Sequence, residues 1–290
     1  MKSTKKNKGY YLISVIMLIS SVIMLIPLIM AFFTSLKPLS EIQTNATTIL
    51  PKEWMWSNYA EAMKEGNWLR YMYNTAFVTT ITVVVSLVIN SMAGYALARI
   101  PFKGREILFF TALLGMMIPP QVTMIPTFLM LKRMPLVGGN DIFGMGGSGL
   151  MNTYMGLILP YIAGSFGVFL CRQFYINFPD SLDDAAKIDG CSRIRAYFQI
   201  YIPLSKPVLA TLAVIKASGT WSEYLWPLVI TNKDYMKTVQ IALPAFKQET
   251  GTIWNLLMAA TIVTCLPLLI LFIFAQKYFI EGIVTTGIKG

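Results

Sequence analysis

The sequence has no histidine, few charged residues and only three cysteines. Without histidine, Ser–His–Asp triads, histidine acid–base catalysis and histidine–metal sites are excluded. Cys171, Cys191 and Cys265 are scattered and fit neither a disulfide framework nor a metal cluster. Charged residues make up 13% of the chain, against roughly 25% in soluble proteins. Since 55% of the residues are apolar and the mean hydropathy is +0.58, the composition predicts an integral membrane protein and excludes a disordered chain.

Six runs of about 20 residues carry little charge, the length that a helix needs to cross the hydrocarbon core. They are 11–33, 74–98, 107–131, 151–170, 207–230 and 256–276. Only the fifth run contains charged side chains, Lys216 and Glu223. Because helices satisfy their own backbone groups in lipid, the sequence predicts an all-α polytopic fold with six transmembrane helices. The first run is predicted to be a retained span, because it exceeds the length of a signal-peptide core and no small-residue cleavage pattern follows it.

Lysine and arginine predict the orientation of the spans. Together, 14 lysines and arginines lie in the segments 1–10, 99–106, 171–206 and 277–290. Only nine lie in the segments 34–73, 132–150 and 231–256, although these contain more residues in total. Since basic residues favour the cytoplasmic side, both termini are predicted to be cytoplasmic. The expected organisation is a cytoplasmic N-terminus (1–10), a six-span membrane domain (11–279) and a cytoplasmic tail (280–290).

The cytoplasmic segment 171–206 is longer than most loops in a compact bundle and predicts two short helices. The first begins at Ser181, where Ser181 and Asp184 are spaced as a capping box. It ends at Gly190, because glycine readily adopts the left-handed backbone conformation that often terminates an α-helix. The adjacent Ala185–Ala186 pair leaves a shallow face that another protein can approach closely.

The second predicted helix begins near Ser192 and ends before Pro203. Four apolar residues recur on it at helical spacing and form one expected stripe: Ile194, Tyr197, Phe198 and Tyr201. Such a stripe also suits an interfacial loop that lies on the membrane. A DNA-binding helix-turn-helix is disfavoured, because only one basic cluster is present and both ends are tethered to spans.

At these residues the chain resembles the membrane-spanning subunits of ABC importers. Their EAA loop is matched at fixed spacing by Asp184-Ala185-Ala186, by Asp189-Gly190, and by Ile200 with Ile202-Pro203-Leu204 and Pro207. Asp184 stands where glutamate is usual, Cys191 where alanine is commonest and Tyr197 where phenylalanine is usual. Further stretches are similar to the carbohydrate branch, in particular to maltose-permease G-type subunits: Leu50-Pro51, Asn58-Tyr59, Gly94–Arg99, Ile118-Pro119, Ile125-Pro126, Gly167–Leu170, Trp221, Trp226–Leu228 and Gly287–Gly290.

The resemblance implies a type I ABC importer permease in the bacterial plasma (inner) membrane that carries a sugar or oligosaccharide. It also implies three partners, which are a second permease subunit in a heterodimer, an ABC ATPase dimer and an extracytoplasmic solute-binding protein. The residues that would couple to the ATPase are Asp183, Asp184, Ala185, Ala186, Asp189, Gly190 and Pro203. Asp183 and Asp184 also suit the N-terminal end of a helix dipole, so capping and partner contact both remain open.

No G-x-x-x-x-G-K-[ST] motif occurs, and the glycine-rich stretch 138–149 contains no lysine. ATP and Mg²⁺ are therefore expected on the partner ATPase. This chain is expected to be no enzyme and to bind no cofactor, metal or nucleic acid.

The ionisable residues of the fifth span, Lys216 and Glu223, are candidates for the translocation path, because charge within a membrane usually faces water or a partner. They are seven residues apart, which predicts one helix face. Trp221 and Trp226 flank Glu223, and aromatic faces beside polar groups suit sugar rings. The alternative is a snorkelling side chain within an interfacial aromatic belt.

Pro119 and Pro120 in the third span predict either a simple kink or a broken helix that gates the outer side. In the outer segments, Trp54, Trp56, Tyr59 and the stretch 138–149 are candidates for docking the binding protein.

The sequence is also compatible with other functions. Within the family, glycerol phosphate or polyamine-type solutes are rivals, and Lys216 would also suit acidic uronate glycans. An ion-coupled secondary transporter would need several carboxylates in the membrane, and only Glu223 is present. A membrane enzyme lacks paired carboxylates or a nucleophile constellation.

Overall fold

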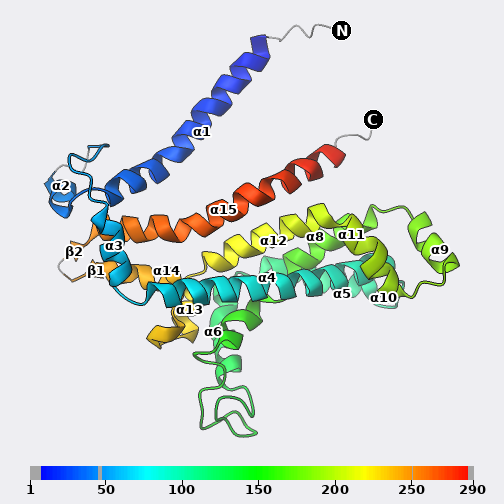
Figure 1. Ribbon diagram of the computed structural model, residues 1–290. Coiled ribbons are helices and arrows are strands. Elements are labelled where there is room, and N and C mark those ends of the chain that lie inside the picture. Colours follow the sequence, from blue (N-terminus) through cyan, green and yellow to red (C-terminus); the bar gives the residue numbers. More distant parts are fainter. Residues whose placement is uncertain (1–7, 45–47, 250, 287–290) are drawn as a thin grey trace. The chain divides into compact units, whose positions relative to one another are not determined.

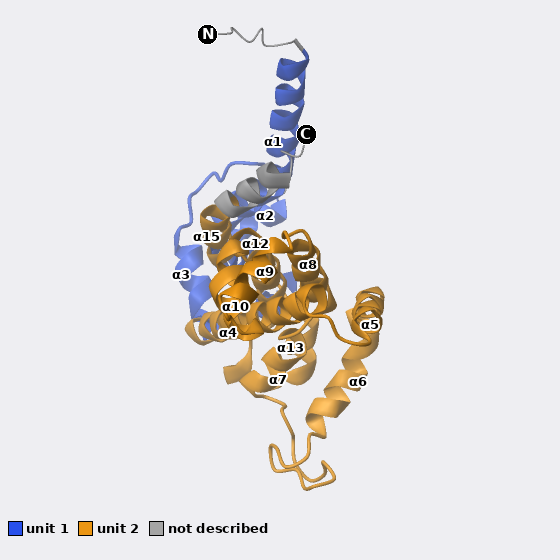
Figure 2. Ribbon diagram, turned by 90° about the vertical axis from the view of Figure 1, so that its right-hand side faces the viewer, with its two compact units in different colours: residues 1–68, 243–266 blue, residues 69–242, 267–290 orange. Residues whose placement is uncertain are grey.

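The computed structural model describes residues 8–44, 48–249 and 251–286, which fold mainly into helices (Figure 1). Residues 1–7, 45–47, 250 and 287–290 lie outside the described residues, and with them parts of the predicted termini and the Gly287–Gly290 match. The chain divides into two compact units, residues 1–68 with 243–266 and residues 69–242 with 267–290 (Figure 2).

The first unit contains the N-terminal helix and the start of the C-terminal one. Its elements are α1 (Lys8–Ser35), α2 (Leu39–Thr44), α3 (Ser57–Lys64), the 3₁₀ helix η4 (Leu243–Phe246), the antiparallel pair β1 (Lys247–Gln248) and β2 (Gly251–Thr252), and the first part of α15 (Trp254–Thr286). Asn58 joins these elements, because its Nδ2 donates to the carbonyls of Ser35 (2.8 Å) and Lys37 (2.9 Å). Its Oδ1 accepts from Asn255 Nδ2 at 3.1 Å. A buried amide thus satisfies backbone groups at the end of α1.

The second unit is built around the long helix α4. Its elements are α4 (Trp68–Arg99), α5 (Arg105–Met117), α6 (Pro120–Lys132), α7 (Tyr154–Ile158), the 3₁₀ helix η1 (Leu159–Tyr161), α8 (Ser165–Ile176), α9 (Ser181–Ile188), α10 (Arg193–Ala196), the π-helix η2 (Tyr197–Tyr201), α11 (Ile202–Leu204), α12 (Lys206–Trp221), α13 (Leu225–Ile230), the 3₁₀ helix η3 (Asp234–Met236), α14 (Val239–Ala242) and the rest of α15. In Figure 1, α9 lies at the end of this unit opposite to α13, and α6 projects to one side of α4.

Two glycines bring α4 and α8 into close contact. A Cβ added to Gly94 would lie 2.5 Å from Cys171 Cβ, and one added to Gly167 would lie 2.7 Å from Asn90 Cγ. Asn90 Oδ1 also accepts the backbone N–H of Gly164 at 3.0 Å. Small residues that permit such an approach are typical of helix pairs in membranes, where hydrophobic burial does not drive helices together.

Among the described residues, three helices are long and apolar enough to cross a membrane alone: Gly9–Ser35, Trp68–Arg99 and Trp254–Gln276. They contain the first, second and sixth predicted spans. Three further candidates are bent pairs: Arg105–Met117 with Pro120–Lys132 (104°), Tyr154–Tyr161 with Ser165–Ile176 (44°) and Arg193–Leu204 with Lys206–Trp221 (80°). The fold reaches the predicted number of six spans only if each bent pair counts as one.

The remaining three predicted spans are not continuous helices. The third breaks at Ile118, which is extended (φ −88°, ψ 117°) because a following proline disfavours the helical region. The fourth breaks at 162–164, and α8 continues to Ile176, six residues beyond the predicted end of this span at Leu170. The fifth ends as α12 at Trp221 and resumes as α13.

Candidate functional site

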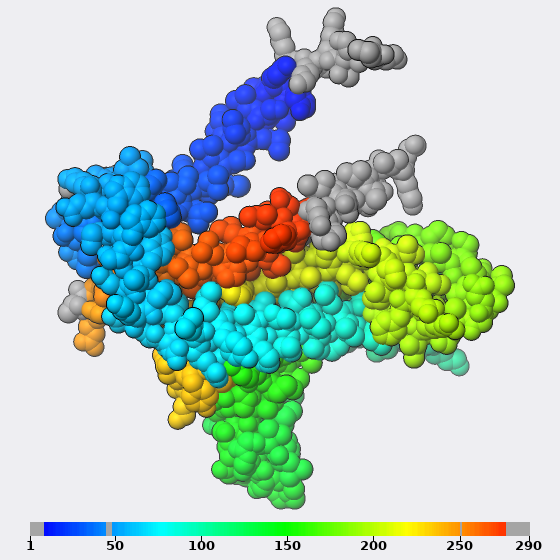
Figure 3. Space-filling view, in the orientation of Figure 1, coloured from blue at the N-terminus to red at the C-terminus, as the bar shows by residue number. Residues whose placement is uncertain are grey.

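The helix α9, the first in the predicted cytoplasmic loop, is exposed at one end of the second unit (Figure 3). It ends at Gly190, whose φ is +67°. The Gly190 N–H donates to the Lys187 carbonyl (3.0 Å) and the Cys191 N–H to the Ala186 carbonyl (2.8 Å). These two bonds form a Schellman motif, so the predicted left-handed stop is confirmed.

The predicted capping box at the start of α9 is wrong. The chain enters α9 through Asp180 in a helical conformation (φ −63°, ψ −24°), and no side chain caps the helix. The backbone carbonyl of Asp180 already accepts the N–H groups of Asp183 (3.0 Å) and Asp184 (3.2 Å). The Asp184 carboxylate instead accepts from Lys187 Nζ at 3.0 Å.

Asp183 points into the unit and pairs with Arg99, the last residue of α4. Arg99 Nη2 lies 2.6 Å from Asp183 Oδ2 and 3.0 Å from Asp180 Oδ1. Arg99 Nε donates to the same Asp183 oxygen at 2.8 Å, and Nη1 donates to the Phe178 carbonyl at 3.1 Å. Only 6% of the Arg99 side chain is exposed, so these charge-assisted bonds anchor α9 to α4.

The predicted coupling residues divide between the two faces of α9. Ala186 is buried and Asp183 is largely so. The others on or just after the helix are exposed: Asp184, Ala185, Asp189 and Gly190. Ile188 is also 85% exposed. These residues form the exposed surface of this helix.

The second helix begins at Ser192 as predicted, since Ser192 Oγ accepts the N–H of Arg195 at 3.2 Å. Its predicted single stripe is wrong: Tyr197 and Tyr201 are buried, whereas Ile194 and Phe198 are more than half exposed. The π-helical turn η2 widens the helix just before Pro203, which has no N–H to donate to a carbonyl of the preceding turn.

The two buried tyrosines belong to an aromatic core. Tyr95 of α4 lies 5.3 Å from Tyr197 and 4.7 Å from Tyr201, measured between ring centroids. Tyr197 Oη and Ser91 Oγ of α4 are hydrogen bonded at 2.6 Å. The predicted coupling residue Pro203 is exposed on α11, directly after this core. The loop is therefore attached to α4 at α9 and again at η2.

Lys216 lies on α12, and its Nζ donates to the backbone carbonyl of Tyr161 at 3.2 Å. Tyr161 is the last residue of η1, where the fourth candidate span breaks. A Cβ on Gly164 would lie 2.9 Å from Lys216 Nζ, so the glycine leaves room for the ammonium. The expectation that Lys216 has a polar neighbour is confirmed.

Glu223 does not share a helix face with Lys216, because α12 ends at Trp221. Its Oε1 accepts the N–H of Trp226 at 3.2 Å, in the first turn of α13. This bond lies just beyond the end of α12.

The two flanking tryptophans are buried within the chain. Trp226 belongs to a core with Leu157 and Ile230, and its Nε1 donates to the Gly156 carbonyl at 3.0 Å. Trp221 is 6% exposed. The assignment of Lys216, Trp221, Glu223 and Trp226 to a translocation path stays a prediction.

Pro119 and Pro120 lie at the 104° bend between α5 and α6 and are exposed. Pro120 is the first residue of α6, where a missing N–H costs no helical hydrogen bond. Of the two predicted alternatives, the structure has the broken helix. A gating role for this break stays a prediction.

The outer-segment candidates form ordered surfaces. Trp54 and Trp56 are stacked at 6.4 Å, and Trp56 stacks on Tyr59 at 6.4 Å. Trp54 and Trp56 are also in contact with Phe33 and Phe32 at the end of α1. In the stretch 138–149, five glycines adopt positive φ: Gly138, Gly139, Gly144, Gly146 and Gly149.

Three residues bond across this region without having been predicted as site residues, although the first lies in the matched stretch Gly94–Arg99: Arg99, Tyr161 and Arg172. Arg172 lies two positions beyond the fourth apolar run (151–170), so no charge within a predicted span pointed to it, and no sequence signal pointed to Tyr161. Over the described ranges, no group of three or more Cys, Asp or Glu side chains could hold a metal ion.

These features define a polytopic helical membrane protein: helices long and apolar enough to span a membrane, breaks within three candidate spans, and a long helical loop. Residues 90–284 match the family of binding-protein-dependent transport system inner membrane components, and the chain belongs to this family. It is 35% identical over 267 residues to the arabinooligosaccharides transport system permease protein AraQ of Halalkalibacterium halodurans, covering 91% of each chain. It is 30% identical to the sn-glycerol-3-phosphate transport system permease protein UgpE of Pectobacterium atrosepticum, covering 97% of this chain and 98% of that one.

A solved structure supports the fold. One chain of the crystal structure of a bacterial ABC transporter involved in the import of the acidic polysaccharide alginate superposes with a TM-score of 0.79. The match covers 96% of this chain and 99% of that chain at 23% identity. The fold is therefore that of an ABC importer permease.

Proposed function

We propose that this chain is the membrane-spanning permease subunit of an ATP-driven ABC importer, and that its solute is a sugar or oligosaccharide. Its membership of the transport family and its likeness to an arabinooligosaccharide permease support this proposal. In the proposed mechanism of alternating access, closure of partner ATPases moves the cytoplasmic loop, and the permease pair opens its cavity outward to receive solute from a binding protein.

The observation that carries the proposal is α9, a short helix with an exposed face that is anchored from behind. Asp184, Ala185 and Asp189 lie on the exposed side, and the buried Arg99–Asp183 pair attaches the helix to α4. A helix held in this way can transmit a push from a partner to the spans. ATP and Mg²⁺ would be bound by that ATPase dimer, and this chain would catalyse no reaction.

A second permease would complete the assembly as a heterodimer. The apolar side chains of α1 from Tyr10 to Ile26 are about half exposed or more, and α5 exposes Ile107, Phe110 and Met117. Apolar helix faces of this size need lipid or another membrane protein against them. Both termini would lie in the cytoplasm of a bacterium, with the protein in its inner membrane.

A carbohydrate is favoured as the solute over the glycerol phosphate that one relative's name records. Lys216, Trp221, Glu223 and Trp226 are the proposed path residues, and Pro119 and Pro120 the proposed gate. The stacked surface of Trp54, Trp56 and Tyr59 would dock the binding protein. A cationic Lys216 also keeps an acidic uronate glycan as a rival solute.

The test is site-specific crosslinking of the assembled transporter. A photoreactive phenylalanine analogue at Ile188 of α9, which is 85% exposed, should give an adduct with the ATPase subunit. The same analogue at Trp54 in the predicted outer segment is the matched control and should give no adduct with the ATPase subunit. Co-purification of the ATPase without any adduct at Ile188 would contradict the coupling assignment.

A further inference from the structure

Two buried arginines meet at the last turn of α4. Arg99 reaches from that turn to α9 through Asp183 and Asp180. Arg172 reaches the same turn from α8, because its Nε donates to the Leu97 carbonyl at 3.1 Å. Both side chains are less than a tenth exposed.

Arg172 also holds the start of α5. Its Nη2 donates to both carboxylate oxygens of Glu106, at 3.0 and 2.9 Å. Its guanidinium lies 3.8 Å from the centroid of the Phe109 ring. Cation–π contact and a charge-assisted bond on one planar group fix its orientation as well as its position.

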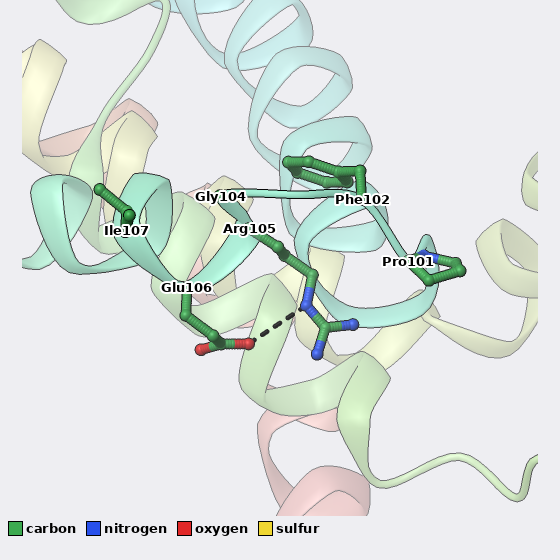
Figure 4. A pocket seen from close by; sticks show the side chains of 6 residues that line it. All are labelled: Pro101, Phe102, Gly104, Arg105, Glu106 and Ile107. Carbon is green, nitrogen blue, oxygen red and sulfur yellow. Dashed lines mark hydrogen bonds and ion pairs between the residues drawn. The ribbon is translucent and has the colours of Figure 1, made fainter.

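α5 also packs on α8 through aromatic side chains. Phe109 is the buried residue of α5, and it stacks on Phe169 of α8 at 6.3 Å. The connection to α4 turns at Gly104, whose φ is +86°, and lines a groove that is open to solvent (Figure 4). In that view Arg105 also pairs with Glu106, but this pair joins two neighbouring residues and reaches no other helix.

We propose that Arg99 and Arg172 form a clamp on the end of α4 that makes α9 and α5 move as one body. A displacement of α9 would then displace α5, which leads directly to the break at Pro119. The inference rests on the proposed function, since it needs an ATPase that moves α9. In this scheme Arg99 and Arg172 are positioning residues, and neither touches the solute.

Distances between spin labels test the clamp in the assembled wild-type transporter. The labels are placed at Ser181 on α9 and Leu114 on α5, after alanine replaces the three native cysteines. The clamp predicts one Ser181–Leu114 distance in the nucleotide-free and the ATP-bound states. A transporter that hydrolyses ATP and imports solute but changes this distance by several ångströms would overturn it. Absence of assembly with any ATPase would instead refute the proposed function.

Substitutions separate a clamp from a general folding role. Arg172→Gln removes the buried guanidinium that bonds the Leu97 carbonyl and the Glu106 carboxylate. Because these charge-assisted bonds are lost, the label distance should change with nucleotide and uptake should fall about tenfold or more. ATPase co-purification and basal ATP hydrolysis should persist. Arg105→Gln is the matched control, because it removes the other partner of Glu106 and should leave uptake and the distance as in the wild type. The clamp would be contradicted if both variants lost uptake equally, or if Arg172→Gln retained full uptake.

Discussion

Lys216 donates a hydrogen bond from its Nζ to the backbone carbonyl of Tyr161, at 3.2 Å, across the gap between α12 and the end of η1. The bond is formed where the fourth candidate span is interrupted, so that a carbonyl released by the break has a charged donor. Glu223 has a different partner, because its Oε1 accepts the backbone N–H of Trp226 at 3.2 Å. Both ionisable groups of the fifth predicted span therefore bond to backbone atoms.

Replacing Lys216 should alter uptake without preventing insertion. An ammonium near mid-span costs at least about 2.5 kcal/mol on insertion scales, so Lys216→Met should be expressed normally. It should change uptake or solute preference, because the Tyr161 carbonyl loses its donor. Lys206→Met, at the exposed start of the same helix, is the control. A cysteine at position 216 that solute protects from a water-soluble reagent would support a place on the path. A reagent that never reaches it, with unchanged uptake in Lys216→Met, would make the residue structural.

A double-mutant cycle tests for an interaction between the Tyr161 phenol and the Glu223 carboxylate. Tyr161→Phe removes the phenol oxygen but keeps the carbonyl that Lys216 uses, and Glu223→Gln removes the charge. If the two groups interact, the effects on thermal stability should fall short of additivity by about 0.5–3 kcal/mol. Additive effects in the purified transporter would rule the contact out.

The long apolar runs of the first, second and sixth spans were predictable, because composition alone decides which segments lipid can accept. The break at Ile118 could be anticipated from two adjacent prolines. The break after Trp221 could not, since Glu223 there caps α13 through a contact that no local pattern requires. The capping box of Ser181 and Asp184 did not form because the Asp180 carbonyl already accepts the Asp184 N–H, and the Asp184 carboxylate accepts from Lys187.

Gly190 should be required for its backbone conformation. A branched or bulky residue at φ +67° is strained by about 1–2 kcal/mol, so Gly190→Leu should loosen the end of α9 and abolish uptake. Asparagine adopts this region readily, and no atom of the chain lies within 4 Å of an added Cβ. Gly190→Asn should therefore retain uptake, unless the partner approaches this face closely. Undiminished uptake in Gly190→Leu would remove the coupling assignment, with membrane insertion verified in both variants.

The contact of α4 with α8 should not tolerate a methyl group. Gly94→Ala places a Cβ 2.5 Å from Cys171 Cβ and 2.8 Å from the backbone nitrogen of Arg172. Overpacking of this kind costs about 1–3 kcal/mol of stability. Gly219→Ala on α12 meets nothing within 4 Å, and should be neutral or stabilising by up to about 1 kcal/mol. Thermal denaturation of the two variants in detergent compares them directly. Equal melting temperatures would show that the close approach at Gly94 does not exist.

This chain should transport only when a separate ATPase drives it. The most direct test is uptake of a labelled oligosaccharide into proteoliposomes that hold this chain and its second permease, with the binding protein present and the ATPase either included or omitted. Uptake should require both the ATPase and ATP, and this chain alone should hydrolyse no ATP. Uptake that persists without the ATPase, or robust hydrolysis by the isolated chain, would contradict the proposed function.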